Sequence, residues 1–259
     1  KAVFHHTDIR DFNAIVPLFK QTAYVFHAAA EARIQPSIID PRSSNESNIT
    51  GTLNVLVAAR DAKVKKVIYS ASSSVYGTQK TMPLREDMIP SPQSPYAVQK
   101  WVGEIYCKTF SDLYGLPSVS LRYFNVYGPR QLTEGAYATV IGVFLRQRSA
   151  EEPMTIVQDG RVKRRDYTYV SDIVAGNIAA LKSERVGKGE ALNLGTGTNY
   201  SVVEVAKRIG GAYTFIPKRL GEAKVTRADI SKAKRLLGWV PRVSFQEGIT
   251  ELKRLYGLI

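Results

Sequence analysis

A tyrosine and a lysine, Tyr96 and Lys100, stand four residues apart in the segment Pro95-Tyr-Ala-Val-Gln-Lys100. On a helix this spacing places both side chains on one face. A serine-rich run, Ser70-Ala-Ser-Ser-Ser74, precedes them and follows an apolar segment. Serines at the end of a strand and a tyrosine on the following helix can meet at one edge of a sheet. We therefore expect the serine run, Tyr96 and Lys100 to converge.

Such a group of side chains suits proton exchange with a hydroxyl. A free phenol has a pKa of about 10, which is too high for a base at neutral pH. A neighbouring ammonium group lowers this pKa because it favours the phenolate. A serine within hydrogen-bond reach would hold the substrate oxygen that exchanges the proton. The alternative is that Tyr96 simply packs and Lys100 is solvated, since many helix surfaces carry such pairs.

Alternating apolar runs and helical patterns provide the elements that would position these residues. We expect three strands and two helices in the first half of the chain, the strands at 23–28, 67–72 and 118–124 and the helices at about 40–61 and 95–114. Ser94 is the expected N-cap of the second helix, with Pro95 at its first position and Gly115 at its end. This alternation predicts a doubly wound parallel sheet with helices on both faces.

The second half of the chain has a looser pattern, which indicates a smaller mixed lobe. We expect helices and short strands there, the helices near 136–149, 170–182, 201–209, 230–237 and 245–256 and the strands at 191–194 and 213–216. Ligands of doubly wound sheets bind at the carboxyl ends of the strands. The lobe would therefore close over the edge that carries the serine run and Tyr96.

Composition excludes several classes of protein. The chain has 259 residues, of which 44% are hydrophobic and 23% charged, so it is an ordinary globular protein without a run long enough to span a membrane. One cysteine and three histidines give no metal centre and favour a cytoplasmic location. The net charge of +13 is compatible with nucleic-acid binding. The basic residues are dispersed, however, which favours a basic surface with a few arginines for a phosphorylated ligand.

The chain also carries a series of ordered motifs, namely His27-Ala-Ala-Ala30, Asn48-Ile-Thr-Gly-Thr52, Ser70-Ala-Ser-Ser-Ser-Val-Tyr-Gly77, Pro95-Tyr-Ala-Val-Gln-Lys100, Leu121-Arg-Tyr-Phe-Asn-Val-Tyr-Gly-Pro-Arg130, Arg165-Asp-Tyr-Thr-Tyr-Val170, Asn193-Leu-Gly-Thr-Gly197 and Gly221-Glu222. Over its whole length it resembles the extended short-chain dehydrogenase/reductase family, in the branch of NAD-dependent nucleotide-sugar epimerases and dehydratases. The resemblance implies Tyr96 as catalytic acid/base, Lys100 as its partner and as a ligand of the nicotinamide ribose, and Ser72 as partner of the substrate hydroxyl. NAD is the implied cofactor, and the positions that match its lining are Asp8, Ile9, Ala28, Ala29, Ala30, Asn48, Ser70, Tyr96, Lys100 and Tyr123.

The same resemblance implies residues for a sugar nucleotide. Asn125 and Arg165 match positions that bind its diphosphate, and Arg219 matches a second diphosphate arginine. Glu222 matches a carboxylate that accepts the ribose hydroxyls, and Thr226 matches the position beside the 2-substituent of the sugar. Threonine is small, so UDP-N-acetylglucosamine and UDP-glucose should both fit. The alternatives are solvated arginines and a threonine that points elsewhere.

One family element is absent from the sequence, the strand, glycine-rich turn and helix that hold the cofactor pyrophosphate. The chain begins near the third strand of the family, with 7–11 beside the adenine, so we expect a shortened chain with impaired cofactor binding. The implied fold is a Rossmann-like sheet without its first βαβ-like unit. It would occupy 1–130, with returning segments near 170–195, and a mainly substrate-binding lobe would occupy 131–259.

The implied function is 4-epimerisation of a UDP-hexose, such as UDP-glucose, UDP-galactose and their N-acetyl forms. Ser73 and Ser74 replace the Asp-Glu pair of the dehydratase branch, which argues against water elimination. The alternatives are a uronate epimerase or decarboxylase of the same branch, or a non-catalytic nucleotide- or RNA-binding protein. The family also implies a homodimer through the helices at 40–61 and 95–114, for which the candidate contacts are Val55, Val98, Val102 and Ile105.

Overall fold

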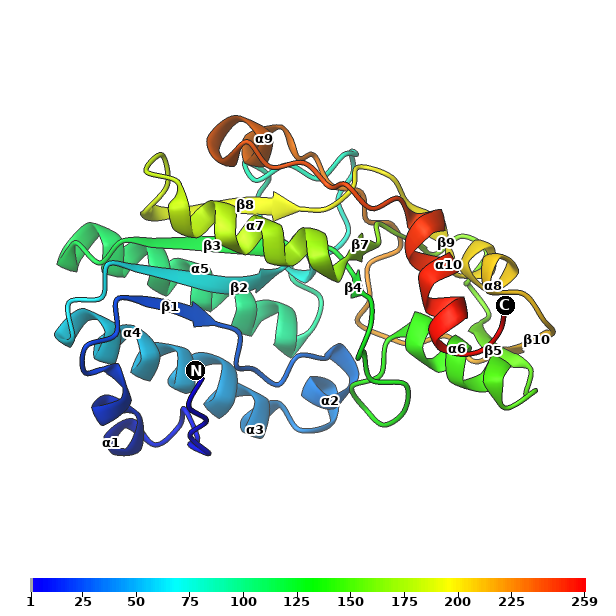
Figure 1. Cartoon of the computed structure of the whole chain (residues 1–259), viewed down its shortest axis with the longest axis horizontal. Coiled ribbons are helices and arrows are strands. Elements are labelled where there is room, and N and C mark those ends of the chain that lie inside the picture. Colours follow the sequence, from blue (N-terminus) through cyan, green and yellow to red (C-terminus); the bar gives the residue numbers. More distant parts are fainter. Residues whose placement is uncertain (1) are drawn as a thin grey trace.

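A four-stranded parallel sheet forms the centre of the larger part of the molecule (Figure 1). The computed structural model describes residues 2–259. The strands lie in the order β1 (Tyr24–His27), β2 (Lys66–Ser72), β3 (Ser118–Tyr123) and β8 (Lys188–Leu194). Strands β2 and β3 are almost entirely buried, as expected for apolar runs that are covered on both faces. The strands expected from the sequence in this part are confirmed.

Helices cover both faces of this sheet. Helix α5 (Pro95–Tyr114) lies behind it with α4 (Gly51–Asp61) below, and α7 (Val170–Lys182) lies in front (Figure 1). Helix α5 begins where its caps predict, because the Ser94 hydroxyl accepts from Ala97 N at 3.3 Å. It ends at Gly115, whose φ of 65° suits glycine. The doubly wound architecture inferred from the sequence is therefore confirmed.

The remaining elements are short or belong to the second lobe. The helix expected over 40–61 is built from α3 (Pro41–Asn45), a π-helical turn (Glu46–Thr50) and α4. The short elements around the sheet are α1 (Phe12–Ile15), 3₁₀ turns at Val16–Phe19 and Ser73–Tyr76, α2 (Ile34–Ile39) and α9 (Ser231–Leu237). Two pairs of short strands lie toward the second lobe, namely β4 (Val126–Tyr127) with β7 (Thr168–Tyr169) and β6 (Arg164–Arg165) with β9 (Tyr200–Ser201). The second lobe contains α6 (Val140–Ser149), β5 (Met154–Val157), α8 (Val202–Ile209), β10 (Tyr213–Ile216) and α10 (Phe245–Leu255).

Three main hydrophobic cores lie on the two faces of the sheet and in the second lobe. Ile68 and Leu121 of the sheet pack with Trp239, which follows α9. In the second lobe, Phe144 and Phe245 belong to a separate core around the parallel pair β5 and β10. Helix α9 therefore packs on the sheet, although the sequence places it in the second lobe. The cause is its apolar contact with β8, which a linear pattern does not reveal.

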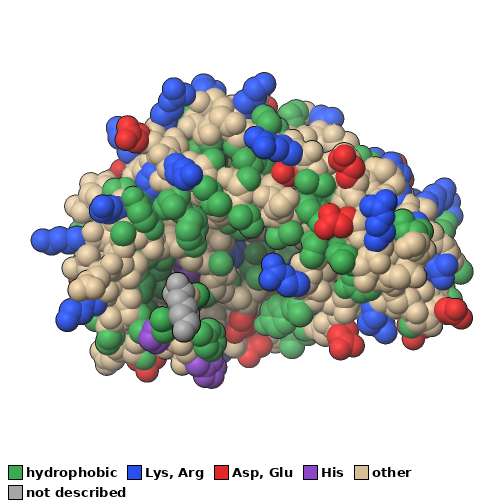
Figure 2. Space-filling model, viewed as in Figure 1, with side chains coloured by type: hydrophobic (Ala, Val, Ile, Leu, Met, Phe, Trp, Pro, Cys, Tyr) green, Lys and Arg blue, Asp and Glu red, His purple; other side chains and the backbone are tan. Residues whose placement is uncertain are grey.

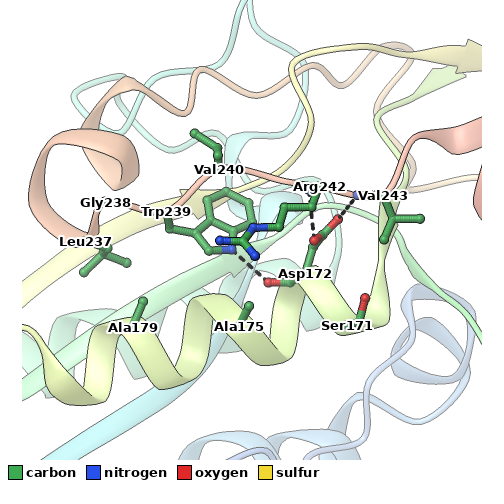
Figure 3. Close-up of a pocket in the computed structure, with 10 residues that line it drawn as sticks. All are labelled: Ser171, Asp172, Ala175, Ala179, Leu237, Gly238, Trp239, Val240, Arg242 and Val243. Atoms are coloured by element: carbon green, nitrogen blue, oxygen red, sulfur yellow. Dashed lines mark hydrogen bonds between the residues drawn. The ribbon is translucent and has the colours of Figure 1, made fainter.

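A cavity of about 440 Å³ lies between α7 and the segment 237–243 (Figure 3). Asp172 of α7 occupies its floor and is buried. The carboxylate of Asp172 accepts from Arg242 N and Val243 N, both at 3.0 Å, and its carbonyl oxygen accepts from Trp239 Nε1 at 2.9 Å. Both carboxylate oxygens are thus occupied by backbone donors. These hydrogen bonds hold the C-terminal segment against α7. The cavity lies apart from the residues expected to do chemistry.

Candidate active site

The three residues expected to carry out the reaction come together at the carboxyl edge of the sheet. Ser72 is the last residue of β2, and Tyr96 and Lys100 lie on the first two turns of α5. The Ser72 hydroxyl accepts from Ser74 N at 3.1 Å, which fixes the turn after β2. Ser37 Oγ of α2 accepts from Tyr96 N at 3.0 Å. A hollow lies between the two parts of the molecule near this edge (Figure 2).

Three features of its environment influence the pKa of Tyr96. Burial raises the pKa of its phenol, while a hydrogen bond with Ser72 and the positive charge of Arg33 act in the opposite direction. Ser72 thus lies close enough to Tyr96 to influence the pKa of the phenol. Arg33 was not foreseen, since it lies far from the motif in the sequence. The site still needs a further favourable charge to bring the phenol into the range of a base at neutral pH.

Lys100 is buried beneath Tyr96 and faces the sheet. Its ammonium donates to Ser70 O at 2.8 Å and lies 5.0 Å from the centre of the Tyr69 ring. Burial lowers the pKa of Lys100 to about 8, and the negative charge of Glu104 partly offsets this effect. The sequence-based expectation was that Lys100 lowers the pKa of Tyr96 directly. In this structure the ammonium instead turns to the Ser70 carbonyl, and Arg33 is the cation that acts on the phenol.

An ion pair supports Lys100 from behind. Glu104, one turn further along α5, accepts from Arg122 of β3 at 2.9 and 2.6 Å. Both side chains are buried, and the Arg122 guanidinium also lies 4.7 Å from the centre of the Tyr76 ring. This pair joins α5 to β3 directly below the site. The pair therefore holds α5, which carries Tyr96 and Lys100, in a fixed position relative to β3.

The residues expected to line a cofactor fall into two groups. Ala28 to Ala30 follow β1 at the open edge, and Ala28 and Ala29 are exposed there. The hydroxyls of Ser70 and Tyr123 are 3.1 Å apart, and Tyr123 donates to Asn177 at 2.8 Å. Ser70 also contacts Lys100, because its carbonyl oxygen accepts from the Lys100 ammonium. The role of these residues in lining a cofactor stays a prediction.

Three of the residues expected to line the cofactor bind other residues of the protein, namely Asp8, Ile9 and Asn48. Asp8 pairs with the Arg10 side chain at 2.6 Å, and the Ile9 carbonyl accepts from Asn54 at 3.0 Å. Asn48 accepts from Glu31 N at 2.8 Å and donates to Glu31 O and to the Gln99 side chain. Its amide is therefore fully bonded and buried. The structure places Asn48 as the connector between the loop after β1 and helix α5.

Arg165 and Glu222, both expected to bind a sugar nucleotide, lie in contact. Glu222 Oε2 accepts from Arg165 Nη2 at 3.4 Å and from Lys163 Nζ at 3.1 Å. No sequence motif singles out Lys163, yet its side chain is only 5% exposed. Alternation along the chain places Lys163 and Arg165 on one side and Arg164, which pairs with Glu204, on the other. Lys163 also pairs with Asp159 at 3.5 Å, so two cations and two carboxylates form a charged cluster beside the hollow.

The Arg-Asp-Tyr motif also positions Asn125 and Thr226. The buried carboxylate of Asp166 accepts from Thr196 N, Gly197 N and Ala228 N at 2.8 to 3.0 Å. Asn125 Nδ2 donates to Asp166 O at 2.8 Å and approaches the Thr226 hydroxyl at 3.4 Å.

Thr226 was expected to form the wall beside the 2-substituent of the sugar. It is 5% exposed, and its hydroxyl accepts from Asp166 N at 3.3 Å. Because this side chain is turned into the protein, we assign it to the support of Asn125 and no longer to a gate. Arg219, by contrast, lies on an exposed loop, and the described part of the chain gives it no ion pair within 4.0 Å.

A buried histidine below the site makes folding sensitive to acid. Thr52 donates its hydroxyl proton to Asn48 O at 2.7 Å, so it accepts from His27 Nε2 at 2.9 Å. Burial together with the charge of Lys100 lowers the pKa of His27 to about 3, so the imidazole is neutral at pH 7. Its unfolded value is about 6.5, so the unfolded chain binds the proton first as the pH falls. Stability is lost between these two pKa values.

We expect the free energy of unfolding to drop by about 2 kcal/mol between pH 7 and pH 5 because of His27. Urea unfolding at both pH values should show this drop in the wild type and a smaller one in His27→Gln, whose amide can still donate to Thr52. His6→Gln, which removes an exposed histidine, is the matched control. An equal drop in wild type and His27→Gln would contradict the assignment.

Two other kinds of feature are absent from the described residues. None of the helices in residues 2–259 is long and apolar enough to cross a membrane. The same residues contain no group of three or more His, Cys, Asp or Glu side chains that could hold a metal ion. The polar groups that gather at the sheet edge are therefore the features on which a functional proposal rests.

Known proteins with the same arrangement are nucleotide-sugar enzymes. A family model described as GDP-mannose 4,6 dehydratase matches residues 1–252. A UDP-glucuronate 4-epimerase from Thermodesulfobacterium geofontis is 38% identical over 95% of this chain and 76% of its own length. The structure of a UDP-glucose 4-epimerase from Thermotoga maritima with UDP-glucose has a TM-score of 0.93 and 36% identity, covering 99% of this chain and 84% of that one.

A third protein has been solved with both a nucleotide sugar and a dinucleotide. It is a UDP-glucuronic acid 4-epimerase from Bacillus cereus in complex with UDP-glucuronic acid and NAD. Its TM-score is 0.88 and its identity 33%, and the match covers 98% of this chain and 82% of that one. With the motifs, the sheet order and the Ser72, Tyr96 and Lys100 geometry, these matches identify the family. The chain belongs to the nucleotide-sugar epimerase and dehydratase branch of the extended short-chain dehydrogenase/reductases.

Proposed function

We propose that this protein catalyses the NAD-dependent 4-epimerisation of a UDP-hexose. The observation that carries the proposal is that Ser72 ends β2, Tyr96 lies in the first turn of α5, and Lys100 on the next turn is buried and donates to Ser70 O of the same strand. The similar proteins include epimerases of UDP-glucose and of UDP-glucuronate. UDP-glucose, UDP-galactose and their N-acetyl forms are the substrates first suggested by the sequence.

The residues at the sheet edge fit the nicotinamide end of a dinucleotide. Lys100 Nζ uses one of its protons for Ser70 O, and within the described residues it makes no second hydrogen bond. The remaining donors suit ribose hydroxyls. When bound, NAD supplies a hydride acceptor and donor for C4 of the sugar. Its positive charge would also favour the Tyr96 phenolate.

In this proposal Tyr96 moves the proton of the reacting hydroxyl. The phenolate accepts the proton of the 4-hydroxyl while Ser72 holds that oxygen, and a 4-keto sugar results. After the sugar turns over, Tyr96 returns the proton to the oxygen on the opposite face. Arg165 and Asn125 would hold the diphosphate and leave the hexose free to rotate. Glu222 would then exchange part of its pairing with Arg165 and Lys163 for the ribose hydroxyls.

Water elimination, the reaction named by the matching family model, does not suit these side chains. The turn after β2 has Ser73 and Ser74 where the family resemblance implies an acid and a base in dehydratases. Ser73 is buried, and Ser74 Oγ is a buried hydroxyl without a hydrogen-bond partner in the structure. Hydroxyls of pKa far above neutrality do not replace a carboxylate pair in proton abstraction.

Product analysis tests the proposal. The protein would be incubated with NAD and separately with UDP-glucose, UDP-galactose, UDP-N-acetylglucosamine and UDP-glucuronate. The expected result is conversion of at least one substrate to its 4-epimer without net change of NAD. Release of CO₂ from UDP-glucuronate would indicate a decarboxylase instead. Salt-sensitive binding of RNA without turnover of any sugar would favour the non-catalytic alternative.

A homodimer remains part of the proposal. Val98 and Ile105 of α5 are 42% and 47% exposed, and they lie on the outer face of this helix. Val55 was expected beside them but is 4% exposed and packs with Ile15 and Ala58. We expect sedimentation at micromolar concentration to show a dimer, and the pair Val98→Lys and Ile105→Lys to shift it to a monomer by charge repulsion. A wild-type monomer at that concentration would contradict this expectation.

A further inference from the structure

Arg33 extends from the sheet part of the molecule toward the second lobe. It occupies the N-cap position of α2, where the backbone is extended with φ −149° and ψ 146°. The side chain is partly buried, and its Nε donates to Tyr137 O at 2.8 Å. Tyr137 belongs to the loop between β4 and α6. The guanidinium is thus held at the boundary where the proposed substrate would lie.

Two acidic groups influence the pKa of Arg33. Burial lowers the pKa of Arg33, while the Tyr96 phenol and the Glu222 carboxylate raise it. Arg33 in turn lowers the pKa of Tyr96. In the proposed function Tyr96 contacts the 4-hydroxyl of the sugar and Glu222 contacts the nucleotide ribose. The contacts of α2 place Arg33 in the same region, because Ser37, one turn after Arg33, accepts from Tyr96 N, and Gln35 donates to Leu220 O, two residues before Glu222.

Helix α2 is fixed by contacts from both sides. Ser37 Oγ accepts from Tyr96 N at 3.0 Å, and Gln35 donates to Leu220 O at 2.9 Å. A Cβ on Gly221 would be only 3.0 Å from Ile38 Cδ1, so the loop before Glu222 packs closely on this helix. These contacts give Arg33 a defined position, unlike a solvated arginine on a free surface.

Arg33 also lacks the carboxylate partner that the neighbouring cations have. Arg165 and Lys163 both contact Glu222. Within residues 2–259 no carboxylate oxygen lies within 4.0 Å of the Arg33 guanidinium. With Nε bonded to Tyr137 O, the two Nη atoms keep their N–H donors for another acceptor. A planar fork of this kind matches a carboxylate in two parallel hydrogen bonds.

We propose that Arg33 selects UDP-sugars whose hexose carries a carboxylate at C6, that is, UDP-hexuronates. The proposal rests on the 4-epimerase function and names its preferred substrate class. C6 is attached to C5, the ring neighbour of C4, so a cation beside the phenol that contacts O4 is within reach of a C6 carboxylate. A neutral hexose offers Arg33 only a hydroxyl, which makes a weaker hydrogen bond than a carboxylate.

The test compares two substrates in three proteins. The wild type should have a higher kcat/KM for UDP-glucuronate than for UDP-glucose. Arg33→Gln should lower kcat/KM for UDP-glucuronate by about tenfold to a hundredfold and that for UDP-glucose by only about threefold. Arg33→Lys should keep part of the preference, because it keeps the charge without the fork. Arg85→Gln, which removes an exposed arginine paired with Asp87, controls for the change in net charge.

Titration calorimetry with UDP-glucuronate, UDP-glucose and UDP shows which part of the substrate Arg33 contacts. A loss of UDP affinity in Arg33→Gln as large as that of UDP-glucuronate would assign Arg33 to the diphosphate and overturn the proposal. Equal losses of kcat/KM for both sugars would also overturn it and leave Arg33 as a positioning residue for Tyr96. If the wild type binds NAD and yet epimerises no sugar, the 4-epimerase function fails. A binding preference for UDP-glucuronate that Arg33→Gln abolishes would still support the carboxylate contact, and no preference would refute it.

Discussion

Replacing Tyr96 by phenylalanine is expected to lower kcat by about 10²–10⁴-fold while the sugar nucleotide still binds. The substitution removes one hydroxyl and leaves the ring that packs between Ser72 and α2. Without the phenol, the proton of the 4-hydroxyl has no acceptor in contact with it, since the Lys100 ammonium is directed at Ser70 O. The contacts expected for the diphosphate, Arg165 and Asn125, are unchanged. The effect should therefore fall on kcat and not on the dissociation constant of the substrate.

Tyr114→Phe is the matched control, because it makes the same chemical change at an exposed position of the same helix. Single-turnover rates and calorimetric dissociation constants should be measured for both variants. Tyr114→Phe should behave as the wild type in both. Wild-type turnover in Tyr96→Phe would refute its assignment as acid/base. An equal loss of substrate binding would show that the phenol serves recognition instead.

The sequence predicted the sheet, α5 and the convergence of Ser72, Tyr96 and Lys100 because their signals are local. Ser94, Pro95 and Gly115 define the ends of α5 through contacts within one turn. Tyr96 and Lys100 share a face through helical spacing alone. A strand that ends at Ser72 then brings the serine to the same edge by the rule for parallel sheets. Each of these inferences needs no knowledge of distant contacts.

The missed residues depend on contacts between distant segments. Arg33 reaches Tyr137 across a sequence separation of 104 residues, and no motif marks it. Lys163 is an exception. Residues i and i+2 of an extended segment point to the same side, so the sequence could have predicted that Lys163 and Arg165 lie together at β6. Thr226 was assigned by resemblance in a loop, where insertions move residues relative to the core. Its bonds with Asn125 and Asp166 became evident only in three dimensions.

The largest expected loss of stability concerns the pair of Glu104 and Arg122. Glu104 accepts two hydrogen bonds from a guanidinium whose side chain is 4% exposed, and its own side chain is 7% exposed. Removing one partner leaves a buried charge without compensation, which costs about 3–5 kcal/mol. Glu104→Gln should therefore lower the free energy of unfolding by an amount in this range. Urea unfolding at pH 7 measures it, with Glu134→Gln in the exposed loop before α6 as control.

A double variant shows whether the cost comes from the unpaired charge. Arg122→Met combined with Glu104→Leu replaces both charges by apolar side chains and should be more stable than either single variant, because no buried ion remains unpaired. Additive losses would contradict the coupling.

Glu104→Gln should also lower the pKa of Lys100 further below its ordinary value, because the carboxylate opposes the effect of burial there. The alkaline limit of activity would then shift to lower pH, which a variant that only loosened the helix would not produce.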